Sequence, residues 1–157
     1  MKKLKNWDNN NWLSSNKYIF SLTHFLRKQI NFSKKTNILD VGCGRGKIIF
    51  TLSKRYQMTN LPLGIDIVKH KDIKKQIRFI KINALKYLNE TKEKFDIILF
   101  KQSIHFFKFA EIKKILKFSK RNLTPHGKIV ILALCPKKNY WPLFKVFELK
   151  LLKSLEK

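Results

Sequence analysis

Three of the five glycines in this chain lie within five consecutive positions, at 42, 44 and 46. They follow an apolar run at 37–41 and precede a stretch with apolar residues at helical spacing. A glycine-rich turn from a strand into a helix lets the backbone turn tightly and lets a ligand approach the main chain. A tight turn that binds nothing is the alternative, so the interpretation depends on the polar residues that share this edge of the fold.

Two such residues follow later apolar runs. Asp66 ends the second run and Asn83 follows the third. Because the carboxyl ends of parallel strands meet at one edge of a sheet, both would lie near the glycine turn. A carboxylate at Asp66 can accept hydrogen bonds from both hydroxyls of a ribose, and the amide of Asn83 can bond an adenine edge. A solvated aspartate and a helix N-cap are the corresponding structural alternatives.

The elements that would position these residues alternate along the chain. We expect strands at 37–41, 61–67, 77–82, 95–100 and 128–134. We expect helices at 18–30, after Gly46, at 84–88, around 112–116 and near the C-terminus, with a turn at 124–127 ending the fourth helix. Continuous apolar strands separated by helices favour a parallel sheet covered on both faces, so the predicted fold class is α/β, doubly wound.

The run NILDVGCGRG at 37–46 resembles motif I of the class I S-adenosylmethionine-dependent methyltransferases. The runs GID at 64–66, NA at 83–84, FDII at 95–98 and LTPHG at 123–127 resemble the later motifs in the family's order. The resemblance covers residues 37–134 and implies a Rossmann-like, mostly parallel sheet with S-adenosylmethionine as cofactor. A nicotinamide site fits less well, because the glycine spacing is Gly-x-Gly-x-Gly rather than Gly-x-Gly-x-x-Gly.

The resemblance also assigns residues to the cofactor. Asp40 and the backbone of the glycine turn would hold the methionine part, and Asp66 would take the ribose hydroxyls. Asn83 would contact the adenine amino group through its oxygen, at a position where the family often has aspartate. The full implied cofactor set is Asp40, Gly42, Cys43, Gly44, Gly46, Asp66, Ile67, Asn83, Ala84, Lys101 and Gln102. The resemblance implies that Ile67 packs against the adenine and that Lys101 and Gln102 lie near the methionine moiety and the acceptor.

His105 is the candidate catalytic base. Methyl transfer needs the nucleophile aligned with the S–CH3 bond, and a base helps when the acceptor must lose a proton. Histidine titrates near neutral pH, and in relatives this segment faces the reacting methyl group. A histidine packed between Ile104 and Phe106 is the structural alternative. No metal site is expected, because His24, His70 and His126 are scattered along the chain.

Two departures from the family pattern stand out. The chain lacks the Asn/Asp-Pro-Pro-Tyr signature typical of methyltransferases that modify nucleobase or glutamine amino groups. Only 23 residues follow Leu134 in the 157-residue chain, so we expect the sheet to be short of the last two of the usual seven strands. A shortened form, a fragment, or a partner subunit covering the sheet edge would each explain this.

We expect one methyltransferase domain over residues 1–157. Within it, 1–33 would form an N-terminal helical cap or lid, 37–134 the cofactor-binding core, and 140–157 a C-terminal helix. The chain has no apolar run near the roughly 18 residues that a membrane span needs, and its start lacks the apolar stretch of a signal peptide. The expected location is therefore the cytoplasm.

The net charge of +25 comes from 35 Lys and Arg against 10 Asp and Glu. Most of the basic residues are lysines, which fits a solvated surface better than bidentate phosphate binding by arginine. The expected function is methyl transfer to an undetermined acceptor, with a small molecule preferred. One alternative is an RNA methyltransferase that uses the lysine-rich segments 69–75 and 113–121. Another is a catalytically silent relative that only binds.

Overall fold

The computed structural model describes residues 16–132, and their strands form one parallel sheet. The five strands are β1 (Ile38–Val41), β2 (Leu63–Asp66), β3 (Arg78–Lys81), β4 (Phe95–Lys101) and β5 (Leu123–Leu132). Their order is β3-β2-β1-β4-β5, with every neighbouring pair parallel. The chain therefore adds β2 and β3 on one side of β1, then crosses back and adds β4 and β5 on the other side. This reversal confirms the doubly wound α/β prediction and places a topological switch point between β1 and β4.

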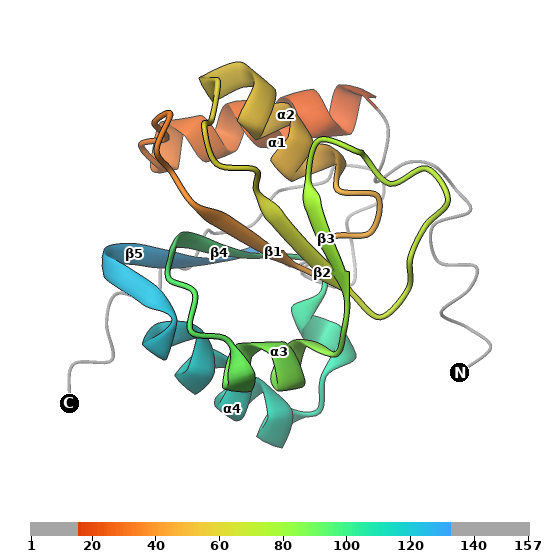
Figure 1. Ribbon diagram of the computed structural model, residues 1–157, viewed down its shortest axis with the longest axis vertical. Coiled ribbons are helices and arrows are strands. Elements are labelled where there is room, and N and C mark those ends of the chain that lie inside the picture. The colour runs from red at the N-terminus through yellow and green to blue at the C-terminus, as the bar shows by residue number, and fades with distance from the viewer. Residues whose placement is uncertain (1–15, 133–157) are drawn as a thin grey trace, which may run out of the picture.

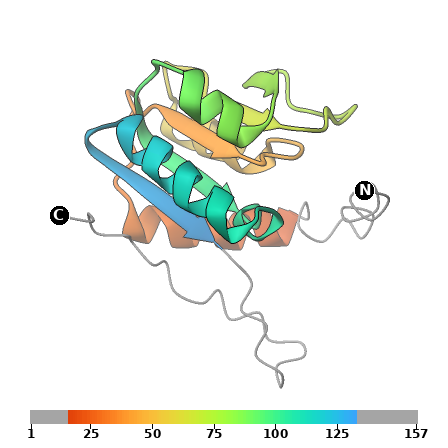
Figure 2. The ribbon, with the colours of Figure 1, turned by 90° about the horizontal axis from the view of Figure 1, so that it is seen from below.

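Helices cover both faces of the sheet. Helices α1 (Asn16–Gln29) and α2 (Lys47–Tyr56) lie on one face, and α3 (Ala84–Glu90) and α4 (Phe109–Arg121) on the other, as Figure 1 shows. Seen from below in Figure 2, α3 and α4 run side by side in front of the sheet. A single 3-10 turn, η3 (Ile104–Phe106), joins β4 to α4. Among residues 16–132, no helix is long and apolar enough to cross a membrane.

The two faces of the sheet bury two separate apolar clusters. Ile38 packs with Leu26 and Ile49 beneath α1 and α2. The next residue, Leu39, points to the opposite face and packs with Leu88 beneath α3. All four residues of β1 are buried, as expected for the central strand of a sheet covered on both sides. This burial holds the carboxyl end of β1, and with it the glycine turn, in a fixed position.

The end of α4 differs from the sequence prediction. The prediction ended this helix in a turn at 124–127, whereas the helix ends at Arg121 and the backbone N–H of Asn122 donates to the carbonyls of Phe118 and Ser119. Strand β5 begins immediately afterwards, pairing Leu123 with Phe95, but further along it pairs Lys128 with Ile97. Residues 124–127 are therefore accommodated as an irregularity within β5, because pairing with β4 resumes on both sides of them.

Several predictions concern residues outside the described range. The helix at 140–157, the end of the fifth strand and the first 15 residues of the cap at 1–33 lie there. The described part of the cap is α1, whose Leu22 and Leu26 are buried against the sheet. It covers the sheet, and Ile19 near its start also lines the cleft described next.

Candidate functional site

A cleft of about 500 Å³ opens at the carboxyl edge of the sheet. Nine of the eleven predicted cofactor residues line it: Gly42, Cys43, Gly44, Asp66, Ile67, Asn83, Ala84, Lys101 and Gln102. They come from the turns that follow four different strands, and the switch point brings these turns together. Asp40 lies within β1 just before the glycine turn and Gly46 is the last glycine of that turn, but neither is part of the cleft lining.

The glycine turn has a backbone that other residues rarely adopt. Gly42, Gly44 and Gly46 have φ values of 74°, 55° and 67°. A Cβ on Gly42 would lie 2.5 Å from the Cβ of Ser103, and one on Gly46 would overlap the side chain of Ile77. A Cβ on Gly44 would meet nothing within 4 Å. Gly42 and Gly46 therefore serve the packing of the turn, whereas Gly44 leaves the backbone open to a ligand in the cleft.

The carboxylate of Asp66 joins the glycine turn to the end of β2. Its Oδ2 accepts from the backbone N–H of Gly44 at 2.9 Å, and its Oδ1 accepts from that of Val68 at 3.0 Å. Each carboxylate oxygen has a second lone pair, so two hydroxyl donors can still bind. The geometry suits a vicinal diol in the cleft.

Asp40 is a buried carboxylate without a hydrogen-bond partner. The residue is 1% exposed, and no donor in residues 16–132 reaches either oxygen. Burial raises the pKa of this carboxyl to about 7, with Lys101 lowering it and Asp66 raising it. A buried polar group without a partner is costly unless a ligand satisfies it. Asp40, buried just before the glycine turn, would therefore be satisfied by a ligand that brings a cation or a donor to it.

The segment after β4 adds a contact to the first helix. Gln102 has a φ of 54°, and its Nε2 donates to the hydroxyl of Tyr18 in α1 at 3.1 Å. The Oε1 of Gln102 is buried and finds no donor within the described chain. Burial raises the pKa of Tyr18 to about 12, so its hydroxyl is neutral at physiological pH. Next to Gln102, the Ser103 hydroxyl donates to the carbonyl of Val41 at 2.5 Å, which ties this segment to the glycine turn.

Asn83 is the N-cap of α3. Its Oδ1 accepts from the backbone N–H groups of Leu85 at 2.9 Å and Lys86 at 3.2 Å. The structural alternative considered for this residue is therefore present in the fold. The side chain also belongs to the cleft lining, between the apolar residues Ile82 and Ala84.

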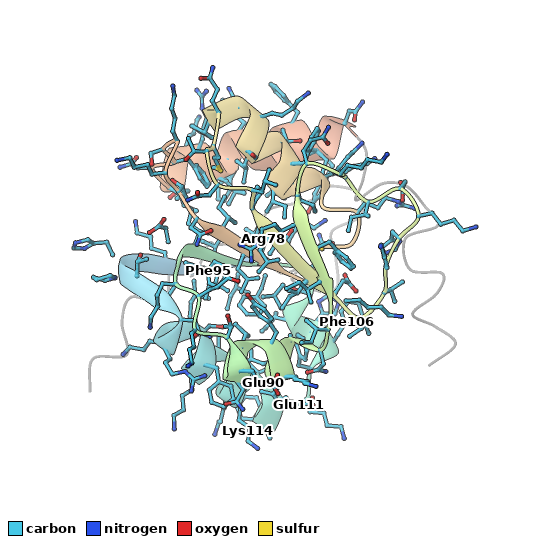
Figure 3. All side chains as sticks on the ribbon, in the orientation of Figure 1. Arg78, Glu90, Phe95, Phe106, Glu111 and Lys114 are labelled. Atoms are coloured by element: carbon cyan, nitrogen blue, oxygen red, sulfur yellow. The ribbon has the colours of Figure 1, made fainter. Side chains whose placement is uncertain are left out.

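His105 lies in η3 at the rim of the site. It is exposed and is not part of the cleft lining. The centroid of its ring lies 4.2 Å from that of Phe106, and Phe106 does line the cleft. Partial burial lowers the pKa of His105, so its neutral, proton-accepting form is favoured. Figure 3 labels Phe106 near the carboxyl ends of the strands. The role of His105 as a base stays a prediction.

Several residues of the cleft were not singled out from the sequence. They are Ile19, Arg45, Lys47, Val68, Ser103, Phe107 and Glu111. Arg45 carries a local signal, since it lies within the glycine turn, and it pairs with Asp72 at 2.8 Å. Glu111 comes from the first turn of α4, and its Oε2 accepts from the backbone N–H of Lys108 at 2.8 Å. Glu111 reaches the cleft only because α4 packs against the sheet in this position, and the sequence around Glu111 does not predict that packing.

Charge is spread unevenly around the cleft. Arg45, Lys47 and Lys101 line it, against the carboxylates of Asp66 and Glu111. The lysine-rich segment 69–75 adjoins the cleft through His70. Residues 113–121 belong to α4, and none of them lines the cleft. No group of three or more His, Cys, Asp or Glu side chains suited to a metal ion occurs within residues 16–132.

Known proteins share both the sequence pattern and the fold. A family model described as a methyltransferase domain matches residues 32–148. No curated protein matches the sequence. Among solved structures, the PH0226 protein from Pyrococcus horikoshii OT3 is 23% identical with a TM-score of 0.68, over 88% of this chain and 64% of that one.

Two further structures contain bound ligands. An amino pentose methyltransferase from Micromonospora echinaspora, bound to S-adenosylmethionine, is 17% identical with a TM-score of 0.60, over 76% of this chain and 50% of that one. The plantazolicin methyltransferase BpumL, in complex with a pentazolic substrate analogue and S-adenosylhomocysteine, is 25% identical with a TM-score of 0.63. That match covers 85% of this chain and 52% of BpumL. The chain thus spans only about half the length of these two enzymes.

Proposed function

The chain belongs to the methyltransferase domain family, and on that premise we propose that it binds S-adenosylmethionine and transfers the methyl group to an acceptor. One observation carries the proposal. An open glycine backbone at Gly44 and a strand-end carboxylate at Asp66 line one cleft, and an unpartnered buried carboxylate, Asp40, lies in the strand that leads into the glycine turn. These groups match a ligand that has a diol in its middle and an ammonium group at one end.

Each group has a separate task in the proposed complex. The two oxygens of Asp66 accept from the ribose hydroxyls while keeping their bonds to the turn. The carboxylate of Asp40 and the free Oε1 of Gln102 are acceptors available for the ammonium group of the methionine moiety. Ile67 and Val68, which are 52% and 44% exposed, offer an apolar surface to the adenine. Covering these two side chains would add a hydrophobic contribution to binding.

When bound, the cofactor would supply an electrophilic methyl group: the acceptor's lone pair would bond to the methyl carbon, and the electron pair of the broken carbon–sulfur bond would stay on sulfur. The protein's main contribution is then alignment of the acceptor. The aromatic side chains of Phe106 and Phe107 line the cleft beyond Gln102 and would contact the acceptor. His105, next to Phe106, is the proposed base when the acceptor must lose a proton.

A small molecule is the preferred acceptor class. Two structurally similar enzymes act on an amino sugar and on a plantazolicin-type natural product, and both share this fold with the chain. RNA is the second candidate, favoured by the lysine-rich segment 69–75 beside the cleft. RNA binding would weaken steeply as salt is raised, whereas binding of a small neutral acceptor would not.

Calorimetry with S-adenosylhomocysteine tests cofactor binding, and a transfer assay with labelled S-adenosylmethionine tests activity. We expect the wild type to bind and Asp66→Ala to lose about tenfold or more in affinity, since hydrogen bonds to a charged group are lost. Asp72→Ala is the matched control, because Asp72 is an exposed carboxylate paired with Arg45. Absence of binding by the wild type, or equal affinity of wild type and Asp66→Ala, would refute the proposal. Binding without methyl transfer to any small molecule or RNA would instead support a silent relative.

A further inference from the structure

A second cavity lies at the edge of the sheet opposite the cleft. It has a volume of about 460 Å³ and is lined by residues of the loop before β1, the start of β4 and the irregular part of β5. Asp96 of β4 lines this cavity, whereas Lys101 at the other end of the same strand lines the cleft. Because a strand rises about 3.3 Å per residue, the two sites are roughly 16 Å apart.

The carboxylate of Asp96 holds the walls of this cavity together. Its Oδ2 accepts from the backbone N–H of Asn37 and its Oδ1 accepts from the hydroxyl of Thr124, both at 2.8 Å. Gly127 passes so close to β4 that a Cβ there would lie 2.7 Å from the carbonyl oxygen of Phe95. These contacts tie the loop before β1 and the break in β5 to the start of β4. The cavity is therefore preformed, as small-molecule sites usually are.

Positive charge gathers around this cavity. Lys35, His126 and Lys128 line it, and Asp96 supplies the one carboxylate among its lining residues. Neither lysine forms an ion pair with any residue in the range 16–132. The irregular pairing of β5 brings His126 and Lys128 beside the start of β4, and bulges commonly re-aim side chains near functional sites. The charge balance of the lining favours an anion.

A hydroxyl donor is left over at the same cavity. The hydroxyl oxygens of Ser33 and Thr36, which both line the cavity, lie 3.2 Å apart and share one hydrogen bond. The same oxygens accept from the backbone N–H groups of Lys35 at 3.3 Å and Ser33 at 2.8 Å. Whichever hydroxyl donates to the other, one of the two protons finds no acceptor among the described residues. An oxygen of a ligand in the cavity can accept it.

We propose that this cavity binds a small phosphate monoester. A phosphate group carries close to two negative charges at neutral pH and three acceptor oxygens. Lys35, Lys128 and the remaining hydroxyl proton supply matching donors. Ile30 and Ile97 also line the cavity, so there is an apolar wall for the body of the molecule. The inference goes beyond the proposed function, because no residue of this cavity lines the cofactor cleft.

Calorimetry with phenyl phosphate tests the site, in about 150 mM salt so that long-range attraction to the basic surface is screened. We expect the wild type to bind one equivalent with a dissociation constant below about 1 mM. Benzoate has a similar body and one charge fewer, so it should bind about tenfold more weakly. Lys35→Gln and Lys128→Gln should each weaken phenyl phosphate about tenfold, because a charge-assisted hydrogen bond is lost.

Lys114→Gln is the matched control. It removes the same charge from an exposed residue of α4 that lines neither the cavity nor the cleft, and that Figure 3 labels. Its affinity for phenyl phosphate should equal that of the wild type. A weaker dissociation constant than 1 mM in the wild type, equal affinity for benzoate, or the same loss in Lys114→Gln as in the other two variants would overturn the inference.

Two competition experiments separate this site from other sources of phosphate binding. Saturating S-adenosylhomocysteine should leave phenyl phosphate bound, and displacement would place the phosphate in the cleft and overturn the inference. A short single-stranded RNA with a 5′-hydroxyl end should bind more weakly than phenyl phosphate. Tighter binding of this RNA that is lost in Lys35→Gln would make the site a polynucleotide surface and also overturn the inference. Binding of phenyl phosphate without binding of S-adenosylhomocysteine would refute the proposed function alone.

Discussion

Replacing Asp40 by asparagine should stabilise the protein and weaken the ligand site. The carboxyl of Asp40 is buried, has no hydrogen-bond partner within the described chain, and has a pKa raised from 3.8 to about 7. Each pKa unit corresponds to about 1.36 kcal/mol, so the ionised carboxyl costs the folded state about 4 kcal/mol above pH 7. Asparagine has a similar shape and no charge, so it removes this cost.

The sign of the pH dependence follows from the direction of the shift. As pH rises above 3.8, the unfolded chain loses the Asp40 proton while the folded protein keeps it, so the wild type loses stability until about pH 7. The amide introduced by Asp40→Asn does not titrate. The stability advantage of this variant should therefore be about 2 kcal/mol at pH 5 and about 4 kcal/mol at pH 8.

Urea unfolding followed by circular dichroism at pH 5 and pH 8 measures this difference. Asp96→Asn is the matched control, because the two oxygens of Asp96 accept from the backbone N–H of Asn37 and the hydroxyl of Thr124, both at 2.8 Å. An amide there keeps one acceptor for the Asn37 N–H and can donate to the Thr124 hydroxyl, but the two charge-assisted hydrogen bonds are lost, so this variant should lose about 1–2 kcal/mol. An Asp40→Asn variant that is less stable than wild type at pH 8, or whose advantage is the same at both pH values, would refute the reasoning.

The same substitution should reduce affinity for S-adenosylhomocysteine by about tenfold or more, since a charge-assisted hydrogen bond to the ammonium group is lost. A variant that is more stable yet binds more weakly would separate the role of Asp40 in the ligand site from its effect on folding. Unchanged affinity would remove Asp40 from the site.

Three further predictions concern the surroundings of the cleft. Gly42→Ala should lower the thermal midpoint far more than Gly44→Ala, because its Cβ would lie 2.5 Å from that of Ser103; equal losses would contradict the packing argument. Tyr18→Phe should cost about 1–2 kcal/mol in urea unfolding, since the buried Nε2 of Gln102 loses its acceptor; full wild-type stability would speak against this contact. His105→Gln should reduce kcat by about a hundredfold while the affinity for S-adenosylhomocysteine stays constant, if the acceptor must be deprotonated; unchanged turnover would exclude His105 as the base.

The sheet was predictable from sequence because its inner strands are buried on both faces. Residues 37–41 and 95–100 are apolar apart from Asn37, Asp40 and Asp96, and the structure places β1 and β4 there. The glycine turn, Asp66 and Asn83 follow such strands directly, so their meeting at one edge follows from the parallel topology. The strands and the residues that follow them can therefore be predicted from the local sequence pattern, together with the rule that the carboxyl ends of parallel strands meet at one edge of the sheet.

Other features depend on contacts between distant segments. Pro125 and Gly127 signal a break in regular structure, but only pairing of β5 with β4 shows that the break lies within a strand. The contact between Tyr18 and Gln102 joins residues 84 positions apart and requires the docking of α1. The raised pKa of Asp40 arises because neighbouring elements remove it from water, which its own sequence neighbourhood does not reveal.

The double role of α1 limits how the protein can be shortened. Its Leu22 and Leu26 are buried against the sheet, while its Tyr18 holds Gln102 and its Ile19 lines the cleft. Removing residues up to Ile30 would therefore expose an apolar face and open the cleft in one step. If a truncated chain failed to bind, misfolding and loss of the site could not be told apart. The contribution of this helix therefore has to be studied by single substitutions in the intact chain.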